Sequence, residues 1–449
     1  MSVFINNGLS GLLAAQTALQ TTANNVANAA TDGYVRQRVE LSERPSTVAA
    51  GASIGNGVSV NGVRRVYDQF VADEVKTAAM SQQRARQIND LSSRLDKLLG
   101  NPEQGISQSV QAFFAQADAL SRDPTSTVNR EQLLSEARVL SDRFAQTEQQ
   151  ILRLGNEVDG RLQQDVSQIN DLARSLSQIN DRIAASANAV PNDLLDERER
   201  LLTSLSELID FTTIRQQDGS VNVLVGNGQP LVLGVKAYEL GLVPNEFDGS
   251  RLELAANGQP ISGLIAGGEV AGLLAFRNEN LDAATRQLGQ LALGLTEVFN
   301  EQHRQGMDLN GDLGSDFFAG IQTTVISSSN NSGSATVTLN VADPAAIEAR
   351  DYILRYTGSA WELMDAASGA PVSMTGSGTA VDPFLAEGLS ITASAGAAAG
   401  DRFLVSAVRN AMSGVKLAIS DTAEIAAASP VSTAASLSNL SDATISSAS

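Results

Sequence analysis

The first thirty residues carry the pattern that most constrains what this chain can fold into. Apolar and small residues recur in alternating steps of four and three, the heptad spacing of helices that pack along a common seam. The seam positions are Ile5, Leu9, Leu12, Gln16, Leu19, Ala23, Val26 and Ala30. A single helix cannot bury such a stripe, so a partner helix is needed, in this chain or in another. The alternative is an ordinary amphipathic helix lying on its own domain.

Length and composition exclude several classes of protein. With 449 residues, the chain is long enough for roughly three domains. Its net charge of −19 repels nucleic acid and anionic membranes, so neither is expected as a partner. Cysteine is absent, which excludes disulfides, thiolate zinc sites and cysteine nucleophiles. The N-terminus lacks the features of a cleaved secretory signal peptide, and no stretch approaches the ~18 apolar residues of a membrane span, so we expect no membrane insertion.

The patterns along the chain predict an α+β multidomain protein. It would consist of an N-terminal amphipathic helix, an elongated helical bundle and two inserted mainly-β domains. Helical periodicity dominates to about residue 209 and returns at about residue 270, with β patterns after each helical stretch. The expected domains are a terminal coiled-coil helix at 1–33, a bundle at 34–210 plus 269–305, a small β insertion at 211–268, a second β domain at 306–408, and a short helix with a mobile Ser/Ala-rich tail at 409–449.

Turns and one recurring string punctuate the predicted bundle. Asn101-Pro102 and Asp123-Pro124 predict breaks between helices, because the residue before proline disfavours helix. The string Gln-Ile-Asn-Asp occurs at 87–90, 168–171 and 178–181. We interpret it as reuse of one helical surface pattern, not as a folded repeat.

No complete catalytic constellation is present. His303 is the only histidine and has no carboxylate at an orienting spacing, so we expect a surface or helix-end role. Ser413 and Lys416 match the S-x-x-K form of some acyl-transfer enzymes, but its companion elements are missing. We therefore expect no enzyme activity, no catalytic residues and no cofactor.

Two acidic stretches invite a metal or ion-pair interpretation. Asp308 to Asp312 resembles the start of a calcium loop, but the required glycine and glutamate are replaced by Leu313 and Ala319. An Asx turn is therefore expected, with a weak cation site as the remaining alternative. Between Asp196 and Arg200, acidic and basic residues alternate, which we interpret as a solvated helical face with local ion pairs.

Several segments resemble one known family. Ser10-Gly11-Leu12, the stretch 23–28 and Thr31-Asp32-Gly33-Tyr34 resemble the N-terminal signature of flagellar rod, hook and hook-associated proteins. Tyr34-Val35-Arg36-Gln37 narrows the resemblance to the hook-associated protein 1 family, as do segments at 192–198, 306–311, 316–318, 399–404 and 409–411. The signature residues are Asn24, Asn25, Asn28, Gly33, Tyr34, Arg36 and Gln37.

The resemblance implies a structural, self-assembling protein of the hook–filament junction. Such proteins are exported by the flagellar type III route without a cleaved signal peptide, and they belong to the extracellular flagellum. The implied partners are further copies of the chain, the flagellar hook protein, a second hook-associated protein and a type III export chaperone. Family members end in a helix that pairs with the N-terminal one. Because this sequence ends at Ser449 in low-complexity residues, we expect the seam to have no partner helix within these 449 residues.

The alternative is a secreted glycan-binding or adhesive surface protein that uses the β domain at 323–408. Its motivation is the group Trp361, Tyr352 and Tyr356, since aromatic rings stack on sugars. Aromatic residues are also common in the cores of β domains, and that interpretation is favoured here.

Overall fold

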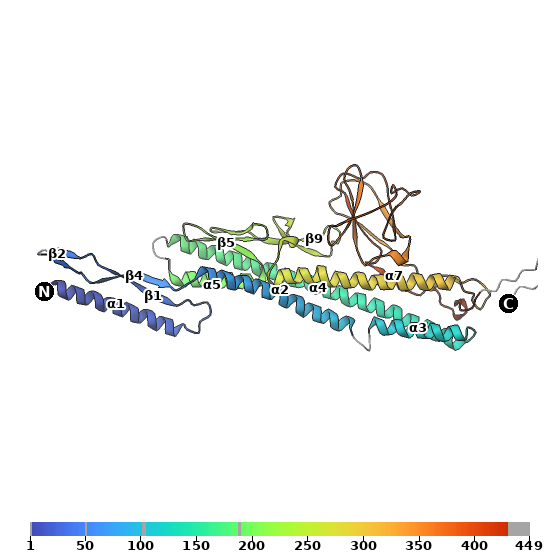
Figure 1. The fold of residues 1–449 in the computed structure, drawn as a ribbon, viewed down its shortest axis with the longest axis horizontal. Helices are drawn as coiled ribbons and strands as arrows, with labels where there is room; N and C mark the ends of the chain where they lie inside the picture. Colours follow the sequence, from blue (N-terminus) through green and yellow to red (C-terminus); the bar gives the residue numbers. More distant parts are fainter. Residues whose placement is uncertain (1, 50–51, 101–104, 187–189, 430–449) are drawn as a thin grey trace, which may run out of the picture. The chain divides into compact units, whose positions relative to one another are not determined.

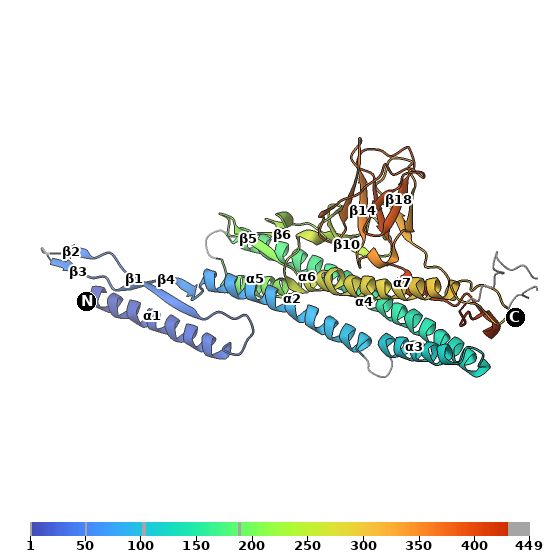
Figure 2. The same ribbon diagram turned by 45° about the vertical axis from the view of Figure 1, so that its right-hand side comes forward.

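The computed structural model describes residues 2–49, 52–100, 105–186 and 190–429 (Figures 1 and 2). The predicted Asn101-Pro102 break and the Ser/Ala-rich tail at 430–449 lie outside the described residues. Two compact units divide the chain. Unit 1 comprises residues 1–87, 161–243 and 253–273, and unit 2 comprises residues 88–160, 244–252 and 274–449.

The N-terminal part of unit 1 is a helix lying along a β ribbon. Helix α1 (Ser2–Ala27) contacts the antiparallel pair β1 (Gln37–Glu43) and β4 (Val58–Arg65), as Figure 1 shows. The short strands β2 (Thr47–Ala49) and β3 (Ala52–Ile54) pair with each other within the β1–β4 connection. A bulge between Glu40 and Leu41 shifts the register of the ribbon.

The rest of unit 1 combines helices with two antiparallel sheets. One sheet has the order β5-β6-β7-β8 and the other the order β11-β10-β9. The helices are α2 (Gln69–Leu99, in part), α4 (Thr127–Ala185, in part), α5 (Asn192–Leu208), η1 (Ser262–Leu264) and α6 (Gly268–Ala275, in part). The strands are β5 (Phe211–Arg215), β6 (Val221–Val225), β7 (Gln229–Leu233), β8 (Lys236–Ala237), β9 (Leu240–Pro244), β10 (Leu252–Ala256) and β11 (Gln259–Pro260).

Unit 2 contains the other helices and the second β domain. Its helical elements are α3 (Ile106–Arg122), the π-helical η2 (Phe276–Leu281), α7 (Asp282–Arg304), η3 (Pro344–Ala346), α8 (Ala411–Gly414) and η4 (Thr422–Glu424). Its strands are β12 (Thr324–Ser327), β13 (Val337–Val341), β14 (Tyr352–Tyr356), β15 (Trp361–Asp365), β16 (Pro371–Val372), β17 (Phe384–Ala386), β18 (Leu389–Ala393) and β19 (Arg402–Ser406). They form sheets of order β12-β19-β14-β15-β16 and β13-β18-β17.

An aromatic cluster forms part of the core of unit 2. Phe113 of α3 and Phe299 of α7 have ring centroids 4.9 Å apart. Phe317 and Phe318 pack against both rings, and Phe113, Phe317 and Phe318 are fully buried. Tilted and edge-on aromatic pairs at these distances add to the free energy gained by burying the rings.

The α+β fold class with a long helical bundle is confirmed, while two segments differ in detail from the prediction. Residues 306–323, assigned to the second β domain, contain no strand, because Phe317 and Phe318 pack against α3 and α7 instead. The helical return expected after residue 409 is limited to α8 and the short η4. The division into five domains stays a prediction.

A candidate assembly surface at the N-terminus

The predicted seam faces solvent along α1. All eight seam residues are exposed, and the side chains of Leu12, Leu19 and Val26 retain 65%, 72% and 72% of their accessible surface. Seven of them belong to α1, whereas Ala30 lies in the turn beyond the helix end at Ala27. The helix therefore presents its large apolar side chains outward.

The opposite side of α1 is small and polar, and it is the side that is buried. Among residues 5–27 of the helix, the buried ones are Ser10, Ala14 and Thr21, each two positions away from a seam residue. Residues two apart on a helix point to nearly opposite sides. Ser10 accepts a hydrogen bond from the Val58 N–H at 3.2 Å, which joins α1 to β4. This polarity is the reverse of a surface helix that packs on its own core.

Helix α1 also contains no charged side chain in its 26 residues. Charged residues are the ones most strongly excluded from fully enclosed positions, because their desolvation is costly. The exposed seam therefore carries no charge whose desolvation would oppose its burial against a partner.

The signature asparagines form the corner between α1 and β1. The Asn25 Oδ1 accepts hydrogen bonds from the Tyr34 hydroxyl and the Gln37 N–H, both at 2.8 Å, and its Nδ2 donates to the Gln37 carbonyl at 2.8 Å. Asn28 donates to the Asn24 carbonyl at 3.0 Å at the helix end. These bonds give the first strand its direction, so the signature residues determine how the ribbon leaves the helix.

Gly33 and Arg36 complete the corner. Gly33 has a φ of +74°, a left-handed conformation that favours glycine, and a Cβ there would collide with the Arg200 side chain. The Arg36 carbonyl accepts a hydrogen bond from the Val66 N–H at 2.7 Å, which continues the ribbon ladder beyond β4. The arginine side chain itself is exposed.

A buried ion pair fixes the base of the ribbon on α5. Arg65 Nε lies 2.7 Å from Asp196 Oδ1, and both side chains are less than a tenth exposed. Burial raises the pKa of Asp196 and Arg65 opposes that shift, while burial followed by the charge of Asp196 raises the pKa of Tyr34. Arg198 is also buried and donates to the Gly219 carbonyl at 2.8 Å. The expectation of a solvated face is therefore wrong for Asp196 and Arg198, which contact the ribbon and a β turn, whereas Arg200 is exposed.

His303 lies at a helix end, one of the two positions expected for it, but it is buried and not on the surface. It lies in the last turn of α7 and keeps only 4% of its surface. Its Nδ1 lies 2.6 Å from the Ser315 carbonyl, and its Nε2 accepts from the Ala426 N–H at 2.9 Å. Burial is the main cause that lowers its pKa. The neutral ring thus links the segment at Ser315 to the segment at Ala426.

The remaining candidate residues serve local structure. Asp308 Oδ1 accepts from the N–H groups of Asn310 and Asp312 at 2.8 and 2.9 Å, which is an Asx turn. The Ser413 hydroxyl donates to the Asn410 carbonyl at 3.0 Å. No group of three or more His, Cys, Asp or Glu residues with metal-site geometry occurs within the described part of the chain.

The aromatic residues of the β domain pack inward. Tyr352 is 2% exposed and donates its hydroxyl to Glu387. Trp361 is half-buried, with ring centroids 5.0 Å from Tyr356 and 5.9 Å from Phe403. These contacts place the three aromatic residues in and around the sheet core, so they do not form a flat exposed platform for a sugar ring.

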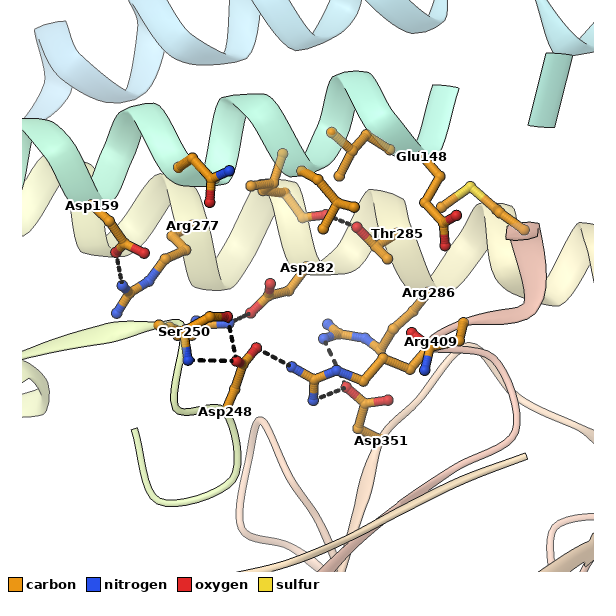
Figure 3. Close-up of a pocket in the computed structure, with 18 residues that line it drawn as sticks. Glu148, Asp159, Asp248, Ser250, Arg277, Asp282, Thr285, Arg286, Asp351 and Arg409 are labelled. Carbon is orange, nitrogen blue, oxygen red and sulfur yellow. Dashed lines mark hydrogen bonds and ion pairs between the residues drawn. The ribbon is translucent and has the colours of Figure 1, made fainter. Parts of the chain in front are cut away.

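An ionic cavity in unit 2 was not anticipated from the sequence. It has a volume of about 230 Å³ and lies between α4, α7 and the loops around Asp248 and Asp351 (Figure 3). Arg277 pairs with Asp159 at 2.9 Å, Arg251 with Asp282 at 2.8 Å, and Asp351 lies 3.9 Å from both Arg286 and Arg409. Each of these arginines has a carboxylate partner, so the charges serve packing between distant segments.

The class of the protein follows from the family models that its sequence matches. Residues 5–34 match the family described as flagella basal body rod protein, residues 92–318 the flagellar hook-associated protein FlgK helical domain, and residues 326–407 the flagellar hook-associated protein 1, D2-like domain. The chain is therefore a structural, non-catalytic component of the bacterial flagellum.

Individual proteins similar to this chain show which flagellar family it belongs to. Flagellar hook-associated protein 1 of Salmonella typhimurium is 34% identical over 440 residues, which cover 96% of this chain and 79% of the relative. The Escherichia coli protein is 33% identical over 439 residues, covering 96% and 80%. The flagellar hook junction protein FlgK from Burkholderia pseudomallei has a similar structure, with a TM-score of 0.72 and 30% identity, covering 78% of this chain and 65% of that protein, just under two thirds. The chain belongs to the flagellar hook-associated protein 1 family.

Proposed function

We propose that copies of this chain assemble with one another at the junction between flagellar hook and filament, with α1 as the assembly element. The observation that carries the proposal is the orientation of α1, whose apolar seam points outward while its small polar side lies on the ribbon. Contiguous exposed apolar side chains mark protein interaction sites. The heptad spacing indicates that the partner is another helix.

The family membership supports the wider set of partners. The hook protein, a second hook-associated protein and a type III export chaperone are proposed as neighbours, and the extracellular flagellum as the site of action after export by the flagellar route. Within the described residues, no helix is both long and apolar enough to cross a membrane. The glycan-binding alternative is not favoured by the homologues or by the packing of Tyr352 and Trp361.

A Leu12→Asp substitution places a charge on the seam. The variant is produced in a flagellated host that lacks its own copy of the protein. Leu12→Asp replaces an apolar side chain that is exposed in the single chain, so the free energy of unfolding should change by no more than about 0.5 kcal/mol. In an assembly the buried carboxylate would have no partner, and attached filaments should be lost. Electron microscopy counts the filaments, and immunoblots of the culture medium report export.

The matched control is Thr22→Asp on the same helix. Thr22 is exposed but lies off the seam, so filament attachment should persist in that variant. Wild-type filament numbers with Leu12→Asp would reject the seam as the assembly element. Equal loss with both variants would show that any charge on α1 is harmful, and that result would reject the specific seam as well.

A further inference from the structure

A second exposed apolar surface lies at the start of α2. Phe70, Val71 and Val75 are 78%, 54% and 59% exposed, and Glu74 is exposed among them. Counted from Phe70, the other three lie one, four and five positions later, which places all four on one side of the helix. Lys76 and Met80, on the other side, are buried. We call Phe70, Val71, Glu74 and Val75 the α2 patch.

A cavity borders the α2 patch. Its volume is about 460 Å³, and its lining includes Tyr34, Tyr67, Val75 and Thr203. Large apolar side chains beside a hollow surface are unusual on a monomer and are typical of an interface.

The charges of the α2 patch and of the β1–β4 ribbon are opposite. Residues 68–75 contain three acidic and no basic side chains. Residues 36–65 contain five arginines and two glutamates, a local charge of +3 in a chain whose net charge is −19. The ribbon is thus a basic region on an acidic protein, next in sequence to an acidic apolar one.

Two arginines of the ribbon lie directly opposite each other. Arg38 and Arg64 are register partners in β1 and β4, and both are exposed. Like charges at directly opposed positions destabilise a strand pair. Glu40, which lies 2.9 Å from Arg64, is the acidic group beside them. A further carboxylate from another molecule would relieve this repulsion.

We propose that the α2 patch of one copy receives the β1–β4 ribbon of a second copy, with Glu74 facing Arg38 and Arg64. The second copy is required because each ribbon is fixed at its base by the Arg65–Asp196 ion pair and paired along its length, so it cannot fold back onto its own α2. The contact joins two different surfaces. It therefore repeats from copy to copy and generates a ring or a helical array, not a closed dimer.

This inference rests on the proposed self-assembly and adds to it a contact outside α1. The absence of cysteine from the chain permits a direct test by disulfide formation. Arg38→Cys and Glu74→Cys variants, carrying different tags, are produced together in a host lacking its own copy, and purified hook–filament structures are oxidised. A disulfide joining the two tagged chains is expected. The matched control replaces Glu74→Cys by Gln217→Cys, an exposed position of unit 1 that is not part of the α2 patch, and should give at least tenfold less product.

Other disulfide patterns overturn the proposal. Efficient linkage of Arg38→Cys to itself would indicate a symmetric contact of ribbon with ribbon. Equal yields for positions 74 and 217 would indicate random collision. Structures that assemble normally and give no 38–74 disulfide would also reject the contact.

A charge exchange supplies an independent measurement. Glu74→Arg should reduce filament attachment at least tenfold, and adding Arg38→Glu and Arg64→Glu to the same chain should restore at least half of it. Unaltered thermal midpoints of the purified variants would show that the fold is intact. No rescue, or no defect with Glu74→Arg, would reject the pairing. If Leu12→Asp blocks attachment while these results are negative, only the ribbon contact fails; if Leu12→Asp is harmless, the proposed function itself fails.

Discussion

At the scale of single residues, asparagine side chains do much of the positioning. Asn25 at the corner of α1, and Asn170 and Asn180 on α4, each accept one backbone N–H and donate to at least one backbone carbonyl. Asn300 on α7 does the same for Phe317 and Phe318. An amide side chain can imitate a strand edge in this way because it carries a donor and an acceptor side by side. Buried backbone groups in the adjoining segments are thereby satisfied.

Burial of His303 should make the free energy of unfolding depend on pH. Its pKa is lowered in the folded chain, so as pH falls below about 6.5 the unfolded chain binds a proton first. The free energy of unfolding should therefore decrease between pH 6.5 and 5. Urea unfolding of the wild type and of His303→Phe, measured at intervals across this range, isolates the effect because no other histidine is present.

The difference between the two proteins is the quantity that matters, since carboxylates titrate in both. The wild type should lose more stability than His303→Phe on going from pH 6.5 to 5. Parallel curves for the two proteins would contradict the prediction. A smaller loss in the wild type would mean that the folded chain favours the charged imidazole.

At the scale of elements, the repeated string on α4 acquires a physical meaning. In Gln-Ile-Asn-Asp at 168–171 and 178–181, the isoleucine is buried and the following asparagine contacts a strand. Asn170 pairs with both backbone groups of Leu240, and Asn180 with those of Val221. At these two places an asparagine of α4 makes the backbone hydrogen bonds that a neighbouring strand would otherwise make with the sheets of unit 1. Periodicity predicted the helix, but the strand partners lie 41 and 70 residues away and leave no local signal.

Asn180→Ala should be among the more destabilising polar substitutions. It removes hydrogen bonds to Val221 and Gly234 in a buried setting and leaves their backbone groups unsatisfied. A loss of about 2 kcal/mol in the free energy of unfolding is expected, measured by urea denaturation followed by circular dichroism. Asn156→Ala, an exposed asparagine on the same helix, serves as the control and should change the value by less than about 0.5 kcal/mol. Equal effects of the two substitutions would contradict the role given to Asn180.

At the scale of the whole molecule, the sequence predicted what depends on local repetition. The heptad spacing predicted α1, and strand patterns predicted the region from 324 to 406. Pairings between remote segments were not predictable, because the local sequence around a charged residue does not indicate which distant residue it contacts. Asp196 has the sequence neighbours of a solvated residue, yet Arg65, 131 residues earlier, lies beside it. The same holds for His303, whose burial depends on Ala426.

The second β domain joins the rest of the chain through two adjacent strands, so its removal should leave the remainder folded. Thr324 and Ser406, which enter and leave the domain, are register partners on the adjacent strands β12 and β19, so their Cα atoms lie roughly 5 Å apart. Replacing residues 325–405 by a two-residue Gly-Ser linker should therefore leave the rest of the chain folded. The aromatic cluster of Phe113, Phe299, Phe317 and Phe318 lies wholly outside the deleted segment.

The shortened chain should still support filament attachment, since the seam and the α2 patch both belong to unit 1. A lower thermal midpoint is expected, because the hydrogen bond from Gln290 to the Ile347 carbonyl at 2.7 Å and its neighbouring contacts are lost. Circular dichroism measures the retained helix, and electron microscopy of the complemented host counts filaments. A variant that keeps its helices but loses all attachment would place an essential contact in the β domain. That outcome would contradict an assembly that depends on the N-terminal surfaces alone.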